Sequence, residues 1–494
     1  MNFLKKQEQT IIVTLLVLIN FIIKGIFLSS NSLAGDEPFS VYHAQMNIVS
    51  IINLLSVGNN PPLYEIILHL WIKIFGISEF SVRMPSLIFS SITVLFIYKI
   101  GIKYLNNRIA LYSSFIYTFS NYHILFAHEA RVYAFLGMLT AISMYYFVGI
   151  IHDYKISSKV NNYILNYEGT SKYLSLAVVN TLIIYSHYFG FFVLMVQIIF
   201  LLFNLPILFK FWKKLLLCFI STALLYLPII LVFFNRFIES SGGTWVQPPT
   251  GLESVYNMLR GFSNAPVVTV CILSLFVFSI VKYLIHFKKE QKNIYFGFVV
   301  LWFVFILCFM FVVSFWIPMF LDRYLMTAAI AFPLLVGISA DYLVKKSKYE
   351  FIIPFVIVLL FVSTVKPGKS NKRDVKETVA KVKEIKNSST IVYFSPDFFD
   401  LNFVYYYNIQ YFRLYDDRNK IRQLLHSENI FPISSYSQID TNLSKYMDKI
   451  VFLDAAADYS YPENSIKCKL DLTYNLRNQY KFYEIFNVYE YELN

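Results

Sequence analysis

Long apolar stretches, separated by short polar segments, dominate the chain up to about residue 365. A helix needs about 20 mostly apolar residues to cross a membrane. The pattern predicts eleven transmembrane helices, and therefore an α-helical polytopic membrane protein. The predicted spans lie near residues 10–29, 85–101, 109–124, 132–151, 173–188, 189–209, 215–234, 266–285, 294–315, 324–343 and 350–365.

The rest of the chain has a different pattern. Residues 366–386 are charged and helix-like, and short aromatic and β-branched runs follow, for example at 391–394 and 450–453. Pro, Asp and Asn separate these runs, as is typical of strands joined by turns. We therefore expect a transmembrane domain over residues 1–365 and a small soluble α/β domain over residues 366–494.

The distribution of basic residues predicts the orientation. Lys5 and Lys6 precede the first apolar run, which is long and is followed by no A-x-A cleavage site, so we interpret it as an uncleaved first span. With the N-terminus in the cytoplasm, most Lys and Arg residues near the span ends fall on the cytoplasmic side, as the positive-inside rule requires. An odd number of spans then places the C-terminal domain outside the cytoplasm. The protein is expected in the cytoplasmic (inner) membrane.

Composition narrows the class further. Of the 494 residues, 57% are hydrophobic and 15% are charged, whereas soluble domains have about 25% charged residues. The net charge of +12 follows from the basic cytoplasmic loops, so we expect no nucleic-acid partner. The four cysteines form no CxxC pair, which argues against a disulfide framework and against a zinc cluster.

The predicted first outer loop, residues 29–84, carries the first candidate chemistry. It opens with Gly35-Asp36-Glu37-Pro38 just beyond the first span. Two adjacent carboxylates at a membrane surface usually face water or a polar cavity. They have two interpretations: a solvated turn in which Asp36 caps the helix that Pro38 starts, or a functional acidic site.

Further along the loop, Asn59-Asn60-Pro61-Pro62-Leu63-Tyr64 breaks one helix and starts another. The stretch Leu63–Phe75 is amphipathic and contains Tyr64, Trp71 and Phe75. It predicts a helix that lies along the membrane surface rather than crossing it. The loop is therefore expected to form two interfacial helices, with the acidic pair at its entrance.

Three other segments on the same predicted side carry unusual polar groups. An Arg near the hydrocarbon edge needs a partner. That partner is either a local carboxylate, Glu129 or Asp322, or an anionic head group such as a phosphate, which suits the fork of an Arg. The segments are His128-Glu129-Ala130-Arg131-Val132-Tyr133, Ser186-His187-Tyr188 and Asp322-Arg323-Tyr324.

Several familiar motifs are missing from the sequence. It has no Walker loop, no GxGxxG after a strand and no GxSxG elbow. A nucleotide-driven pump and a soluble-type hydrolase are therefore disfavoured. No HExxH or similar spacing appears, so a metal site cannot be identified from the sequence and the cofactor requirement, including a divalent metal, stays open.

Together these motifs resemble the integral-membrane GT-C glycosyltransferases, in particular the relatives of the protein O-mannosyltransferases (the dolichyl-phosphate-mannose-protein mannosyltransferase-related family) and of the lipid A aminoarabinose transferase. The resemblance covers roughly residues 1–345. It is carried by Asp36-Glu37, Pro61-Pro62-Leu63-Tyr64, Glu79-Phe80-Ser81-Val82-Arg83-Met84-Pro85-Ser86, the His128–Tyr133 segment, Ser186-His187-Tyr188-Phe189-Gly190, and Pro318 with Arg323-Tyr324-Leu325.

The resemblance implies a GT-C fold and a reaction. Such enzymes take a sugar from a polyprenyl-phosphate carrier and pass it to an extracytoplasmic acceptor, which could be a glycolipid, a polysaccharide or a protein, with inversion at the anomeric carbon. By the resemblance, Asp36 and Glu37 are the catalytic candidates, with Asp36 as general base toward a hydroxyl acceptor. Arg131, Arg323 and Tyr324 are the candidates for binding the donor phosphate.

The same resemblance suggests residues that line the substrate site. One departs from the family pattern, because relatives often have His or Lys before the double proline where this chain has the neutral Asn60. This difference puts a phosphate-binding role for that position in doubt. The substrate-binding candidates are Asn60, Tyr64, Arg83, His128, Glu129, His187 and Tyr188.

Two other classes are the alternatives. A transporter or flippase of lipid-linked saccharides would need polar groups deep in the spans and often has paired repeats with Gly- or Pro-broken helices. Here the ionisable residues cluster at one rim. A structural protein with a membrane anchor would not need eleven spans. The sequence does not identify the sugar, the acceptor or the oligomeric state.

Overall fold

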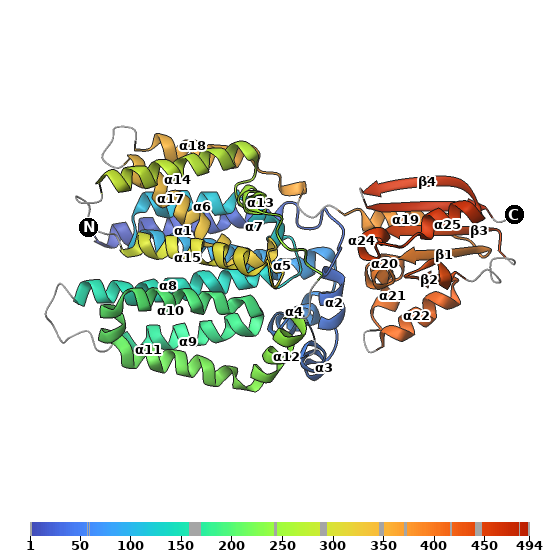
Figure 1. The fold of residues 1–494 in the computed structure, drawn as a ribbon, viewed down its shortest axis with the longest axis horizontal. Helices are drawn as coiled ribbons and strands as arrows, with labels where there is room; N and C mark the ends of the chain where they lie inside the picture. The colour runs from blue at the N-terminus through green and yellow to red at the C-terminus, as the bar shows by residue number, and fades with distance from the viewer. Residues whose placement is uncertain are drawn as a thin grey trace. The chain divides into compact units, whose positions relative to one another are not determined.

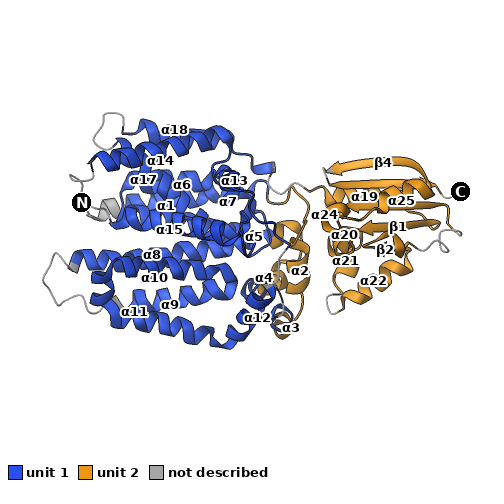
Figure 2. Ribbon diagram, in the orientation of Figure 1, with its two compact units in different colours: residues 1–27, 52–67, 83–370 blue, residues 28–51, 68–82, 371–494 orange. Residues whose placement is uncertain are grey.

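The chain folds into two compact units, which Figure 2 distinguishes by colour. Unit 1 comprises residues 1–27, 52–67 and 83–370, and unit 2 comprises residues 28–51, 68–82 and 371–494. Each unit therefore combines segments that are far apart in the sequence. The computed structural model describes residues 2–56, 58, 60–157, 169–241, 245–286, 294–344, 350–369, 373–414, 417–439, 447–483 and 485–492.

Unit 1 consists of helices (Figure 1) because a helix satisfies its backbone hydrogen bonds within one apolar segment. Short 3-10 helices join some of them: η1 (Tyr188–Gly190), η2 (Leu227–Ile229), η3 (Arg323–Leu325) and η4 (Pro367–Lys369). Three helices contribute residues to both units: α3 (Ile48–Ser56), α4 (Leu63–Phe75) and α5 (Glu79–Tyr104). The others are α1 (Asn2–Gly25), α6 (Asn107–Thr118), α7 (Asn121–Ala127), α8 (Tyr133–Ser157), α9 (Gly169–Ser186), α10 (Phe191–Phe203), α11 (Leu205–Tyr226), α12 (Ile230–Ser241), α13 (Leu252–Phe262), α14 (Pro266–His286), α15 (Ile294–Val313), α16 (Met326–Ala329), α17 (Ala331–Val344) and α18 (Ile352–Thr364).

The described residues include seven helical segments that are long and apolar enough to cross a membrane. Shorter apolar helices occupy Tyr188–Phe203 and Ile352–Thr364. The predicted polytopic helical class is therefore confirmed, whereas the number of eleven spans stays a prediction. The seven segments are Gln7–Gly25, Glu79–Tyr104, Tyr133–Ile156, Leu205–Glu239, Pro266–Ile285, Ile294–Val313 and Arg323–Val344.

Buried polar side chains tie the helices of unit 1 together. The Oγ of Ser143 donates to Oδ1 of Asn180 (2.7 Å), whose Nδ2 donates to Oε1 of Gln197 (2.9 Å). The Nε2 of Gln197 donates back to Ser143 (2.8 Å). All three residues are buried, and the closed ring links α8, α9 and α10. Buried polar groups are tolerated when each finds partners in this way.

Unit 2 contains a five-stranded sheet in the described residues, with strand order β2-β1-β3-β5-β4. β1 pairs in parallel with β2 and β3, whereas β5 is antiparallel to both β3 and β4. The predicted C-terminal α/β domain is thus confirmed. The elements are α2 (Glu37–Ala44), α19 (Val375–Ile385), β1 (Thr390–Ser395), η5 (Asp397–Phe399), α20 (Asp400–Tyr407), α21 (Ile409–Phe412), α22 (Arg418–Ser427), β2 (Ile430–Pro432), η6 (Tyr436–Gln438), β3 (Lys449–Ala455), α24 (Ala457–Ser460), α25 (Ile466–Thr473), β4 (Asn475–Tyr483) and β5 (Phe486–Glu492).

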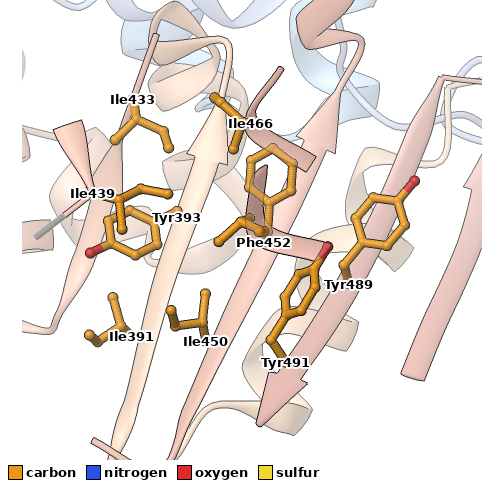
Figure 3. Packing of buried hydrophobic residues seen from close by; sticks show 10 residues of the cluster. Ile391, Tyr393, Ile433, Ile439, Ile450, Phe452, Ile466, Tyr489 and Tyr491 are labelled. Atoms are coloured by element: carbon orange, nitrogen blue, oxygen red, sulfur yellow. The ribbon is translucent and has the colours of Figure 1, made fainter. Parts of the chain in front are cut away.

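Both faces of this sheet are covered. All six residues of β1 are buried, as expected for a strand packed on both sides. Ile391 and Tyr393 pack with Ile466 of α25 on one face (Figure 3). On the other face, Phe394 stacks on Phe403 of α20 with ring centroids 4.9 Å apart. Helix α20 is therefore fixed to the sheet.

Candidate active site

Three of the sequence-predicted residues lie at the ends of helices in unit 1. Arg131 lies in the connection between α7 and α8, and His187 lies between α9 and η1. Arg323 is the first residue of η3, just before α16. Such connections carry polar side chains readily, because the helix ends on either side hold them at fixed positions.

His187 is the centre of this group. The residue is 2% exposed, and its ring lies 5.7 Å from the ring of Tyr324 and 6.0 Å from that of Tyr133, between centroids. Phe189 packs against both His187 and Tyr324, at 5.2 and 4.6 Å. Rings from three separate connections thus enclose the imidazole.

The positive charges of two arginines affect the pKa of this imidazole. Burial, and then the positive charges of Arg131 and Arg323, lower the pKa of His187 to about 3. His187 is therefore neutral at physiological pH. Its Nδ1 accepts a hydrogen bond from the backbone N of Phe189 (3.1 Å), so the neutral ring carries its proton on Nε2. The cluster combines two half-buried arginines with a neutral hydrogen-bond donor.

Arg323 has aromatic and backbone neighbours in the same unit. Its guanidinium carbon lies 5.6 Å from the ring centroid of Trp245, a geometry that suits a cation–π contact. The carboxylate of Asp322 accepts a hydrogen bond from the backbone N of Arg323 (2.7 Å). The hydroxyl of Tyr122 donates to the Asp322 carbonyl (2.6 Å). These contacts hold the start of η3.

His128 and Glu129 make hydrogen bonds that connect helices of unit 1. A ring nitrogen of His128 lies 2.6 Å from the carbonyl of Lys24, and the backbone carbonyl of Glu129 accepts from Oγ of Ser86 (2.6 Å). His128 is buried, while Glu129 is half-buried. These bonds attach the segment between α7 and α8 to the end of α1 and to α5.

The remaining substrate candidates of unit 1 lie in varied surroundings. Arg83 and Tyr64 are almost fully buried, in α5 and α4 respectively. Asn60 is half-buried just before α4. Tyr188 packs its ring 5.8 Å from that of Phe233 in α12. These four candidates therefore lie on different elements. Tyr324, in contrast, packs directly against the ring of His187.

The acidic pair lies in unit 2. Gly35 adopts a left-handed φ of 59°, which glycine reaches at little cost. Asp36 follows at the N-cap position of α2, is exposed, and makes no capping hydrogen bond with its side chain. Glu37 is 1% exposed, and its carboxylate accepts from the backbone N of Ala34 (3.3 Å). The interpretation of Asp36 as a helix cap is therefore wrong.

Two notable residues of unit 1 were not among the sequence candidates. Lys24 is fully buried near the end of α1, donates to Oγ of Ser90 (3.0 Å) and lies 4.1 Å from the ring centroid of Tyr117. A lysine inside an apolar span is a signal that could have identified it. Trp245 had no such signal. Among the described residues, no group of three or more His, Cys, Asp or Glu side chains could hold a metal ion.

Comparison with solved structures defines the fold class. The chain matches ArnT from Cupriavidus metallidurans bound to undecaprenyl phosphate, with a TM-score of 0.57 and 10% identity over 97% of each chain. It also matches the archaeal oligosaccharyltransferase AglB from Archaeoglobus fulgidus, in complex with an inhibitory peptide and a dolichol-phosphate, with a TM-score of 0.57 and 10% identity over 98% of this chain and 74% of that chain. The chain therefore has the fold of the GT-C glycosyltransferases.

A family comparison supplies a narrower match. Residues 59–231 match the family model described as dolichyl-phosphate-mannose-protein mannosyltransferase. The matched family and the two structural neighbours are glycosyltransferases. The resemblance noted in the sequence and the glycosyltransferase class are thus confirmed at the level of fold and family model. No protein with a curated description matches the chain in sequence.

Proposed function

We propose that this protein transfers a sugar from a polyprenyl-phosphate donor to an acceptor outside the cytoplasm, with inversion at the anomeric carbon. An acceptor hydroxyl oxygen attacks this carbon, and the bond from the carbon to the phosphate oxygen breaks. The electron pair of that bond leaves with the lipid phosphate. The hydroxyl proton passes to the carboxylate of Asp36 and is later released to water. The products are the glycosylated acceptor and the free lipid phosphate.

The observation that carries this proposal is the cluster around His187. Tyr133 and Tyr324 pack against the buried ring of His187, at 6.0 and 5.7 Å between centroids, and the half-buried Arg131 and Arg323 precede these tyrosines by two residues and one residue. A leaving lipid phosphate is already anionic, so it needs charge stabilisation more than it needs a proton. Arginine forks match phosphate oxygens, and the neutral His187 can add a hydrogen bond without another charge. The undecaprenyl phosphate of ArnT and the dolichol-phosphate of AglB support this type of ligand.

The contrast between the two carboxylates supports Asp36 as the base. Asp36 is exposed, and its side chain is not used as a cap. Glu37 is buried and binds the backbone of its own turn. A general base must reach the proton that it removes, which favours Asp36. Glu37 then supports the turn, and Tyr324 lines the phosphate site beside His187.

The lipid and the acceptor complete the proposal. We place the C-terminal domain outside the cytoplasm and the N-terminus inside, in a cytoplasmic membrane, as the basic loops indicate. The lipid tail lies between the spans of unit 1. The acceptor is a glycolipid, a polysaccharide or a protein.

The test is a transfer assay with purified protein, a panel of radiolabelled polyprenyl-phosphate sugars and a membrane extract as acceptor source. Wild type should consume one donor, and Asp36→Asn should lose at least about 100-fold in rate because general-base catalysis contributes about 10²–10⁴-fold. Asp448→Asn, which neutralises an exposed aspartate of the C-terminal domain, is the matched control and should transfer normally. If no donor is consumed, or if Asp36→Asn keeps its rate, a transporter of lipid-linked saccharides becomes the better explanation.

A further inference from the structure

Helix α20 of the C-terminal domain presents three polar side chains on one face. Asn402, Tyr405 and Tyr406 have the spacing i, i+3 and i+4, which aligns side chains along a helix. Their hydrogen-bond partners lie in residues 33–35 and 77–79. These segments lie near the two ends of the predicted first outer loop (residues 29–84), and all of these residues belong to unit 2. One short helix therefore holds both ends of the segment that contains Asp36.

Tyr406 makes the central contact. Its hydroxyl accepts a hydrogen bond from the backbone N of Leu33 and donates one to Oε1 of Glu79 (2.6 Å). Burial and the carboxylate of Glu79 raise the pKa of Tyr406, so the hydroxyl keeps the proton that it donates. A hydrogen bond to a charged group is among the stronger ones in proteins. Tyr406 thus bridges the start and the end of the loop.

Asn402 holds the residue immediately before Asp36. Its side-chain amide donates to the carbonyl of Gly35 (3.2 Å). Gly35 has a left-handed φ of 59°, and a Cβ on it would lie 2.4 Å from a guanidinium nitrogen of Arg373. The acidic turn therefore depends on glycine for its backbone conformation and on α20 for its position. Tyr405 adds a third contact, because its hydroxyl donates to the carbonyl of Ile77 (2.7 Å).

Residues that follow Asp36 in the chain hold α2 against the same domain. The guanidinium carbon of Arg418 lies 5.2 Å from the ring centroid of Phe39, and Arg418 is bound by the fully buried carboxylate of Asp400 at the start of α20. The hydroxyl of Tyr42 donates to the Leu414 carbonyl (3.2 Å). Asp36 itself is exposed. It is therefore an exposed residue on a backbone that is fixed both before and after it.

We propose that α20 is the positioning element of the acidic loop, and that Tyr406 and Asn402 hold the backbone of Asp36 in the geometry that sugar transfer requires. This inference rests on the proposed function of Asp36. The C-terminal domain, for which the sequence suggests no role, thereby has a part in the chemistry. Misplacing a catalytic group by about 1 Å can cost about 100-fold in rate.

The test uses the full chain and two neighbouring tyrosines. Tyr406→Phe removes only the hydroxyl that binds Leu33 and Glu79. Tyr407→Phe is the matched control, because its hydroxyl also donates to a carboxylate, that of Glu428, but within the C-terminal domain and away from the loop. Asn402→Leu, which keeps a similar volume, removes the Gly35 contact separately. Monodispersity and thermal unfolding show whether each variant folds.

The first readout needs no substrate. Hydrogen–deuterium exchange of peptides covering residues 31–45 should become about tenfold faster in Tyr406→Phe, since Leu33 loses its acceptor and the loop loses one anchor. Peptides covering β1 and β3 should exchange as in wild type. In Tyr407→Phe the loop should exchange normally. Unchanged loop exchange, or faster exchange throughout the sheet, would overturn the inference.

The second readout separates positioning from binding. In Tyr406→Phe the turnover of the donor should fall about 10- to 100-fold, while the Kd for undecaprenyl phosphate should stay at the wild-type value. Equal turnover in the Tyr406 and Tyr407 variants would overturn the inference. If wild type itself transfers no sugar, the proposed function fails, while the exchange experiment still reports whether α20 holds the loop.

Discussion

The cluster around His187 uses side chains from connections between apolar helices of one unit, whereas the turn at Asp36 is held by a helix that lies 367 residues later in the chain. In the cluster, the positions of Arg131 and Arg323 follow from the ends of helices that the hydropathy pattern already indicates. In the turn, the backbone of residues 33–35 takes its partners from α20. Under the proposed function, the comparison teaches that binding the phosphate and placing the base are separate structural tasks. Variants can therefore disturb one and leave the other.

The largest effect is expected when both cations of the cluster are neutralised. In Arg131→Gln/Arg323→Gln, binding of undecaprenyl phosphate should weaken roughly 100- to 10,000-fold, because each hydrogen bond to a charged group contributes about 1.5–3 kcal/mol. Equilibrium binding of the radiolabelled lipid checks this. Arg236→Gln, which removes the cation of an ion pair with Glu239 on α12, is the control. Wild-type affinity in the double variant would exclude the cluster as the phosphate site.

A smaller effect on transfer is expected from Glu37, the buried neighbour of the proposed base Asp36. Glu37→Gln keeps a side-chain oxygen for the Ala34 backbone N but removes the charge, which costs about 1 kcal/mol. Transfer should then fall about fivefold, far less than in Asp36→Asn. Steady-state rates of the two variants, measured side by side, provide the check. If Glu37→Gln lost more activity than Asp36→Asn, the roles of the two carboxylates would be reversed.

Lowering the pH should reduce the stability of the folded protein, because His187 is buried in its neutral form. Because its pKa in the folded protein is about 3, below the ordinary value of 6.5, the unfolded chain binds a proton between these values that the folded protein does not. Stability should therefore fall as the pH decreases from 6.5 toward 3. Thermal unfolding across this range, in wild type and His187→Gln, measures the effect. The variant should show a shallower pH dependence, and equal slopes would argue against a buried neutral His187.

The smallest effect is expected at Trp245. The cation–π contact with Arg323 lies at an exposed ring, where such contacts contribute about 0.5–1 kcal/mol. Trp245→Ala should weaken undecaprenyl phosphate binding about two- to fivefold without changing turnover at saturation. Titration of the lipid into both proteins tests this. A loss of turnover with unchanged affinity would assign Trp245 to the chemistry instead.

Local sequence patterns could predict a large part of the molecule. Runs of apolar residues predict spans directly, and the double proline at Pro61-Pro62 predicts the start of α4, because local chemistry decides both. The candidates Arg131, His187 and Arg323 were found because unusual polar groups at span ends stand out. The short runs of aromatic and β-branched residues, separated by Pro, Asp and Asn, likewise predict the C-terminal strands.

Long-range contacts were not predictable in the same way. Nothing near Tyr406 in the sequence indicates that its hydroxyl binds Leu33 and Glu79, since that depends on how α20 packs on the sheet. The sequence also suggested Asp36 as a helix cap, because Asp is common at that position. The cap does not form, and the backbone of Asp36 has helical angles (φ −85°, ψ −7°) rather than the extended ones that capping residues typically adopt. Tertiary contacts, rather than local sequence preference, decide both the partners of Tyr406 and the backbone conformation of Asp36.

The most direct test of the central claim measures binding and transfer on the same two variants. Undecaprenyl phosphate affinity and donor turnover should be determined for Asp36→Asn and Arg131→Gln in the full-length protein. We predict that Asp36→Asn binds the lipid like wild type and transfers sugar at least about 100-fold more slowly, and that Arg131→Gln binds the lipid at least about tenfold more weakly. If Asp36→Asn lost lipid binding, or retained transfer, the division between a phosphate-binding cluster and a separately held base would be contradicted.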